Sequence, residues 1–237
     1  MDAVISAPVA ANGDFAADVA AFSGYWRTVR EQLDKQPTEA LKQAARAARF
    51  LFLRTHARIL YDRLTDGRRK FVRLERLVYD AAEVVPGLVP TRAQVAAESE
   101  LRQSEKEGME IDQGILCNQF LADPVCGLHL CHTMLLPREE SADALAKFLR
   151  DGRLDLGTAK VERQGKAVVL LLSNPRFLNS EDLSTQSATE IGADVCILDP
   201  HSQVAVLRGD FMPEGKYAGR RVFNAGINLT HLSLIHI

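Results

Sequence analysis

The sequence predicts an α+β protein in which an all-helical N-terminal domain precedes a mixed α/β domain. As far as about residue 151, apolar residues recur at helical spacing, and beyond it short strand-like runs alternate with turn residues. We therefore place the helical domain at residues 1–154 and the α/β domain at residues 155–231. No internal repeat or low-complexity linker separates them, so the boundary depends on the change of period alone.

The helical half contains several segments with start and stop signals. Residues 38–67 form one predicted helix that ends at Gly67, and residues 70–85 form a second. The apolar stripes are Leu41, Ala45, Ala48, Phe52 and Ile59 in the first, and Phe71, Leu74, Leu77 and Val78 in the second. Thr91 and Gln94 have capping-box spacing and open a third helix, whose polar middle at residues 98–115 is either a solvated face or a functional one. Ser141 is the expected cap of a last helix that Gly152 ends.

The α/β half begins with a predicted β-hairpin around Gln164-Gly165, which Asn174-Pro175 closes. Ser180 is the expected N-cap of a helix with Leu183, Ile191 and Val195 on its buried face. The run "SQVAVLRG" predicts a further strand. Residues 221–223 then look like a strand that arrives at a turn, residues 224–228.

Composition indicates a globular protein with no charge-driven partner. The chain has 237 residues, 46% apolar and 25% charged, with a formal net charge of −2. Arginines are interleaved with acids, so we expect no nucleic-acid or membrane partner. No segment approaches the ~20 apolar residues of a membrane span, and the N-terminus lacks the basic region of a signal peptide. We expect a cytoplasmic protein.

Four cysteines and two neighbouring histidines raise the question of a metal site. They are Cys117, Cys126, Cys131 and Cys196, with His129 and His132. A zinc site requires paired ligands at loop spacing and a second pair elsewhere, whereas these residues form one apolar cluster with no clear second pair. We interpret them as ordinary buried thiols and histidines in a helix and expect neither a metal nor a disulfide framework.

Several motifs of the α/β half stand in a recognisable order. After the hairpin come "NPRFLN", a capped helix, a strand that ends in "LRG", and "VFNAGINL". This order resembles the opening of the crotonase (enoyl-CoA hydratase/isomerase) superfamily, whose members bind acyl-CoA thioesters. The resemblance implies that residues 155–231 are the first, incomplete part of a crotonase-like ββα core.

The helical preface resembles one branch of that superfamily, the arylacetyl-CoA dioxygenases. The matching stretches are "PGLVPTRAQVAAE", "EKEGMEIDQGI", "LNSED" and "GRRVFNAGINL". The resemblance implies a cofactor-independent dioxygenase that acts on a dihydroxyphenylacetyl-CoA thioester, with acyl-CoA and O2 as substrates and no metal or organic cofactor. An enolate held by an oxyanion hole would react with O2 to give an arylglyoxylate and free CoA. It also implies a homo-oligomer, trimeric or hexameric, for the complete protein.

Two other functions stay open. One is an ordinary hydratase, isomerase or thioesterase of the superfamily, and the other is a non-catalytic helical interaction module.

The same resemblance assigns candidate site residues. The backbone N–H of Ile227 matches the first oxyanion donor, and fixed N–H dipoles stabilise developing negative charge without reorganisation. Glu181 matches a substrate-site carboxylate, although it also suits a helix N-terminus. The expected turn residues are Ala225, Gly226, Asn228 and Leu229, and the expected CoA contacts are Glu214, Gly215, Lys216, Tyr217 and Arg176. For Arg176 the alternative is a solvated loop residue.

The final residues depart from the resemblance, which ends near Leu232. The family's second oxyanion N–H comes from a downstream Gly-rich segment that this chain lacks. Residues 232–237, "LSLIHI", back-translate to the mosaic-end sequence used in transposase-based library preparation. We expect this tail to be adapter-derived and the chain to be the N-terminal portion of a longer enzyme. The alternative is a coincidental apolar strand.

Overall fold

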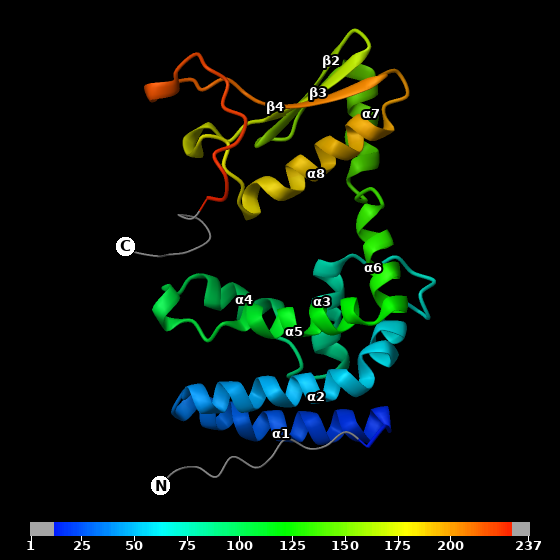
Figure 1. Cartoon of the computed structure of the whole chain (residues 1–237), viewed down its shortest axis with the longest axis vertical. Helices are drawn as coiled ribbons and strands as arrows, with labels where there is room; N and C mark the ends of the chain where they lie inside the picture. The colour runs from blue at the N-terminus through cyan, green and yellow to red at the C-terminus, as the bar shows by residue number, and fades with distance from the viewer. Residues whose placement is uncertain (1–11, 229–237) are drawn as a thin grey trace. The chain divides into compact units, whose positions relative to one another are not determined.

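A computed structural model describes residues 12–228 of the chain. The chain divides into two compact units between Leu136 and Pro137, and their elements are labelled in Figure 1. The first unit is helical, and the second contains a four-stranded sheet with helices. The predicted α+β class with a helical N-terminal region is thereby confirmed. Leu229 and the proposed tail, residues 232–237, lie outside the described residues.

The helical unit is built around two long neighbouring helices (Figure 1). Its elements are α1 (Phe15–Lys35), α2 (Glu39–Leu64), α3 (Leu74–Val84), α4 (Arg92–Ser99), η1 (Gln103–Glu105), α5 (Met109–Ala122) and α6 (Pro124–Leu135). The core packs α2 against α3 and α5 through fully buried side chains, among them Leu53, Leu60, Tyr61, Leu77 and Phe120. The predicted helix around Cys126 and Cys131 is confirmed as α6. Cys126 is buried as expected, but Cys131 is exposed, so the prediction of buried thiols is wrong there.

Most of the predicted α2 stripe is buried. Thr38 caps the helix by accepting a hydrogen bond from the Leu41 N–H, and Leu41, Ala45, Ala48 and Phe52 are buried. Ile59 was expected in the same stripe, but 41% of it is exposed. The 3.6-residue period carries the apolar face around α2, so that Leu60 and Tyr61, directly after Ile59, take the buried positions.

The predicted face of α3 also needs a correction at its start. Phe71 precedes the helix and is half exposed, with its ring stacked on His129 at 5.1 Å between centroids. Leu77 and Val78 are buried as expected. Arg73 is the residue before the first helical position, so Phe71 lies outside the helical repeat that places the other two.

The continuous helix predicted from Thr91 across residues 98–115 is wrong. Its start is confirmed, because the Thr91–Gln94 capping box is formed, but α4 ends at Ser99 and α5 begins after Gly108. Gly108 has φ +83°, a left-handed conformation that favours glycine. The buried carboxylate of Glu98 accepts hydrogen bonds from the N–H groups of Glu107 (2.6 Å), Gly108 (3.0 Å) and Met109 (2.8 Å). These groups lie at the start of α5, where the helix itself supplies no acceptor for them.

Replacing Glu98 by alanine is expected to lower the free energy of unfolding by about 2–4 kcal/mol, because buried N–H donors without an acceptor cost about 1–3 kcal/mol each. Urea unfolding measures the loss, and hydrogen exchange at the amides of Glu107 and Met109 should accelerate with it. Glu100→Ala is the matched control on an exposed neighbour and should change stability by no more than about 0.5 kcal/mol. Equal effects of the two variants would contradict the anchoring role of Glu98.

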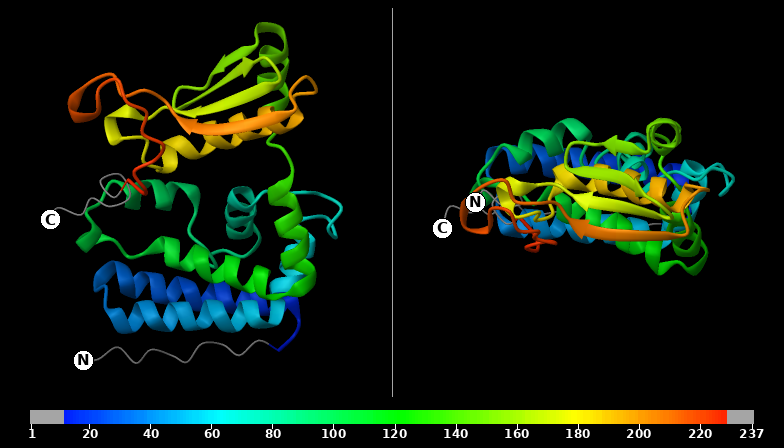
Figure 2. Two further views of the ribbon diagram at one scale, coloured as in Figure 1. Left: turned by 45° about the horizontal axis from the view of Figure 1, so that its top comes forward. Right: turned by 90° about the horizontal axis from the view of Figure 1, so that it is seen from above.

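The second unit consists of a sheet with helices packed on one face, as Figure 2 shows for α8. Its elements are α7 (Ser141–Asp151), β1 (Arg153–Asp155), β2 (Ala159–Gln164), β3 (Ala167–Leu172), η2 (Pro175–Phe177), α8 (Leu183–Leu198), β4 (Val204–Gly209) and η3 (Gly215–Tyr217). The sheet order is β1-β2-β3-β4, antiparallel except for the parallel pair β3–β4 that α8 connects. Phe148 of α7 and Val195 of α8 pack on Val161 and Val168. Helical periodicity thus continues past the division between the units.

The predicted hairpin and the strand "SQVAVLRG" are confirmed as β2–β3 and β4. Ser141 does not cap α7, because its hydroxyl donates to Asp194 of α8 at 2.6 Å. Leu183 is 67% exposed, in contrast to the predicted face, whereas Val195 is buried. Residues 221–223 form no regular strand, and only Arg221 makes a bridge, to Phe211.

Within the described residues, no helix combines the length and the apolar character needed to cross a membrane.

Candidate active site

The final turn of the described chain lies against the start of α8 through a two-residue bridge. Glu181 N–H donates to the Gly226 carbonyl at 2.8 Å, and Asn228 N–H donates to the Glu181 carbonyl at 2.8 Å. The carbonyl of Gly226 and the N–H of Ile227 belong to one trans peptide and point in opposite directions. The N–H of Ile227 therefore points away from Glu181, and it donates no hydrogen bond to any described residue.

The buried side chain of Asn228 fixes the far end of this turn. Its Nδ2 donates to Asp182 Oδ2 at 2.8 Å, and both residues are about 95% buried. Asp182 is the N-cap of α8 and accepts the Ser184 N–H at 2.9 Å. The expected cap, Ser180, lies before this position, so that prediction is wrong. Asn228 acts here as a structural anchor between the turn and the helix N-terminus.

Gly209, at the end of β4, allows the closing segment to pass directly over the strand. A Cβ atom at this position would lie 1.7 Å from the Val222 carbonyl oxygen. Arg221 reinforces the contact by donating to the Gly209 carbonyl at 3.0 Å and by stacking over the Phe211 ring at 3.8 Å. The close approach places residues 224–228 beside Glu181 and had no signal in the sequence beyond a glycine at a strand end.

The loop before α8 is held against the same segment. Asn179, which has φ +57°, donates from Nδ2 to the Val222 carbonyl at 2.7 Å and accepts the Asn174 N–H at 2.7 Å. Asn174 in turn donates to the Ser180 carbonyl at 3.1 Å. The motif "NPRFLN" therefore closes on itself and binds the backbone that leads to the turn.

Asn224 is a site residue that sequence reasoning missed. Its Nδ2 donates to Glu181 Oε1 at 2.8 Å, and its Oδ1 accepts the Gly226 N–H at 2.5 Å. An Asn two residues before a Gly with φ +98° is a signal for an Asx turn. The partner Glu181 is 43 residues away in sequence, so the second contact had no local signal.

The expected CoA contacts are exposed or half-buried. The stretch Glu214–Tyr217 contains the short helix η3, where the Lys216 ammonium lies 5.6 Å from the Tyr217 ring centroid. Arg176, in η2, lies over the Phe177 ring at 5.1 Å. Neither basic side chain has an acidic partner among the described residues. Ala225 is exposed beside Gly226, and the contribution of Leu229 stays a prediction.

A partly exposed ion pair ties together the ends of two strands and the start of the closing segment. Lys160 of β2 donates to Asp210 at 2.7 Å, and Ser173, which follows β3, donates to the same oxygen at 3.1 Å. The hydrogen bond to Asp210 raises the pKa of Lys160. Burial opposes ionisation of Asp210, but the Lys160 hydrogen bond and the Phe211 N–H together hold its pKa below the ordinary value. The start of the closing segment is therefore tied to both central strands.

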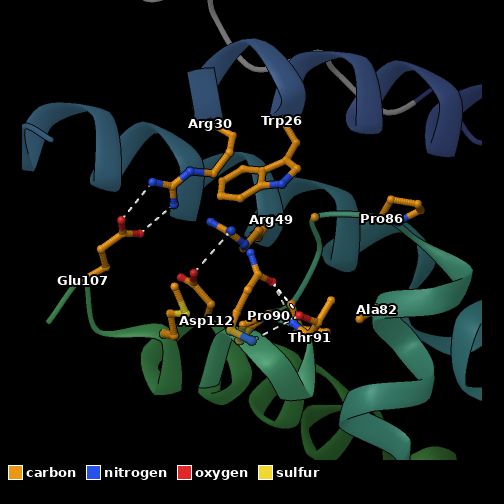
Figure 3. Close-up of a pocket in the computed structure, with 13 residues that line it drawn as sticks. Trp26, Arg30, Arg49, Ala82, Pro86, Pro90, Thr91, Glu107 and Asp112 are labelled. Atoms are coloured by element: carbon orange, nitrogen blue, oxygen red, sulfur yellow. Dashed lines mark hydrogen bonds and ion pairs between the residues drawn. The ribbon is translucent and has the colours of Figure 1, made fainter. Parts of the chain in front are cut away.

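The helical unit contains a separate cavity of about 250 Å³ (Figure 3). Arg49 is buried there, 4.2 Å from the Trp26 ring centroid and 3.2 Å from Asp112. Arg30 makes two hydrogen bonds to Glu107, at 2.8 and 2.9 Å. Burial lowers the pKa of Arg49 and raises that of Asp112, although each side chain opposes the shift in the other. These charges stabilise one another, so the cavity has the features of a structural ion-pair network.

In the described part of the chain, no three His, Cys, Asp or Glu side chains are grouped to hold a metal ion.

Comparison with known proteins adds the decisive observation. The chain matches no protein-family model. It is 44% identical over 217 residues to the (3,5-dihydroxyphenyl)acetyl-CoA 1,2-dioxygenase of Amycolatopsis orientalis. The chain is a homologue of that dioxygenase. The alignment covers 86% of this chain and 50% of the relative, so the chain spans about half of the relative's length. The resemblance to arylacetyl-CoA dioxygenases is confirmed, and the role of each site residue stays a prediction.

Proposed function

We propose that the intact protein is a dioxygenase of a dihydroxyphenylacetyl-CoA thioester, with O2 as co-substrate and no resident metal or organic cofactor. The observation that carries this proposal is the 44% identity to a relative that is named for that activity. The geometry of the turn supports it, because the Ile227 N–H is fixed in direction and is free of partners among the described residues.

The proposed chemistry begins with loss of a proton from the carbon next to the thioester carbonyl. Negative charge then develops on the thioester oxygen, where the Ile227 N–H is the donor that this chain supplies. The enolate gives an electron to O2, and recombination forms a carbon–peroxide bond. Attack of the peroxide on the thioester carbonyl expels CoA, and cleavage of the O–O bond leaves the arylglyoxylate. Both atoms of O2 enter the acid, and the two hydrogens of the methylene leave as protons.

Glu181 is the acidic side chain that the bridge and Asn224 hold against the turn that carries this donor. Asn224 occupies its Oε1, while Oε2 takes no hydrogen bond from the described residues. We assign that oxygen to the substrate, as a proton acceptor or as a partner of a ring hydroxyl. Lys216 is the proposed contact to a CoA phosphate, which an exposed ammonium binds as a point charge.

The test uses the intact protein with dihydroxyphenylacetyl-CoA in an oxygen electrode, with free thiol measured in parallel. We expect O2 uptake and CoA release in equal amounts, unchanged after treatment with a strong chelator. CoA release without O2 uptake would identify a thioesterase and overturn the proposal. A preparation that adds water to an enoyl-CoA instead would identify a hydratase.

A further inference from the structure

We infer that Asn224 is the residue that positions the oxyanion turn, by joining the Glu181 carboxylate to the Gly226 N–H. The inference rests on the proposed function and adds a residue to which that function assigns no role. Asn224 has no contact with the oxyanion position itself. It acts through the peptides on either side of Gly226, and so it is a positioning residue rather than a catalytic one.

In the turn, three consecutive peptides are each held by one hydrogen bond. The peptide that precedes Gly226 is fixed by its N–H, which donates to Asn224 Oδ1 at 2.5 Å. The next peptide, which carries the Ile227 N–H, is fixed by its carbonyl, which accepts the Glu181 N–H at 2.8 Å. The third is fixed by the Asn228 N–H, which donates to the Glu181 carbonyl at 2.8 Å. Only the first of these restraints comes from a side chain.

Glycine makes that first restraint necessary. Gly226 has φ +98°, and a glycine populates this region and its alternatives with similar ease. Without the Asn224 acceptor, the peptide before Gly226 is free to rotate, and the peptide of the Ile227 N–H is then restrained only from its C-terminal side and through its own carbonyl. A displacement of about 1 Å in a reacting group can reduce a rate about 100-fold.

The other end of the Asn224 carboxamide selects which Glu181 oxygen is free. Nδ2 donates to Oε1 at 2.8 Å, which leaves Oε2 for the substrate. One half-buried side chain therefore couples the donor for the thioester oxygen to the orientation of the neighbouring carboxylate. A residue with only an acceptor or only a donor supplies half of this arrangement.

Two substitutions separate the Asn224 acceptor for the Gly226 N–H from the Asn224 donor to Glu181. Asn224→Ala removes both hydrogen bonds, and we expect kcat to fall about 10- to 100-fold while KM changes less than about threefold. Asn224→Asp keeps the acceptor for Gly226 but places a second carboxylate beside Glu181. Two neighbouring carboxylates raise the pKa of one of them, so a shared proton restores the donor as pH falls. The activity of Asn224→Asp should therefore recover on acidification, whereas that of Asn224→Ala should not.

Hydrogen exchange at backbone amides tests the inference without a measurement of enzyme activity. In the intact protein without substrate, hydrogen exchange at the Gly226 N–H should accelerate about tenfold or more in Asn224→Ala and stay near wild type in Asn224→Asp. The control is Asn118→Ala, the same change at an exposed site on α5, which should alter neither amide exchange nor kcat.

Each outcome decides a separate point. Wild-type exchange at Gly226 and an unshifted Ile227 amide resonance in Asn224→Ala would overturn the role of Asn224. So would wild-type kcat in that variant when the unmodified protein is active. If the unmodified protein consumes no O2 with the thioester, the proposed function fails, and the amide measurements still decide whether Asn224 positions the turn.

Discussion

Replacing Ile227 by proline is expected to reduce kcat of the intact protein about 10²- to 10³-fold, the loss that follows removal of one oxyanion donor. Proline has no N–H, and the Ile227 N–H makes no hydrogen bond to the described residues, so the substitution removes the proposed donor without breaking a hydrogen bond of the described structure. KM for the thioester should change little, because the donor acts on charge that develops in the transition state.

The matched control is Ile227→Val, which keeps the N–H and shortens a side chain that is 62% exposed. We expect its kcat within threefold of wild type. Hydrogen exchange at the amides of Glu181 and Asn228 reports whether the bridge survives in both variants. A proline variant with an intact bridge and wild-type kcat would exclude the Ile227 N–H from the reaction.

Local signals predicted the elements whose stabilising contacts are local. Thr91 caps α4 through the N–H of Gln94, three residues away, and the pair was visible in the sequence as a capping-box spacing. The hairpin at Gly165 was visible because the chain there needs a residue with φ +63°, flanked by apolar runs. In these cases one short window contains both partners of the interaction.

Other features were missed because their partners are distant in sequence. Glu98 ends one helix and starts another through N–H groups nine to eleven residues later, across a stretch whose composition alone favours helix. Ser180 and Asp182 are both residue types suited to an N-cap. The structure uses Asp182, whose carboxylate also accepts a buried hydrogen bond from Asn228, 46 residues away. Periodicity cannot distinguish such alternatives.

The candidate site likewise contains some features that the sequence predicted and others that it did not. The turn "NAGIN" was predicted from its glycine and from the resemblance, and the structure describes it as a turn bridged to Glu181. Asn228 was predicted to shape the turn, and its buried contact with Asp182 gives a physical means of doing so. Asn224 and Gly209 were not predicted, because their importance depends on where Glu181 and Val222 lie in the folded chain.

Gly209→Ala is expected to lower the free energy of unfolding by about 2–3 kcal/mol, because an added methyl group that meets backbone forces a backbone shift. The Cβ atom would lie 1.7 Å from the Val222 carbonyl oxygen and 2.9 Å from the Phe223 Cα. Since the closing segment must move away from β4, the Asn179–Val222 hydrogen bond should weaken and the turn should lose its place beside Glu181. Urea unfolding measures the stability, and exchange at the Asn228 amide measures the local displacement.

The control for this substitution is Gly24→Ala on α1, where nothing lies within 4 Å of the added methyl group. An exposed helical glycine replaced by alanine should stabilise the protein by up to about 1 kcal/mol, so the two variants should differ in sign. If Gly209→Ala keeps wild-type stability and a protected Asn228 amide, then the closing segment can move without cost, and the close approach of Val222 to β4 does not hold the turn. A turn displaced in this way would also misplace the Ile227 N–H, so kcat in Gly209→Ala should fall together with Asn228 protection rather than with global stability.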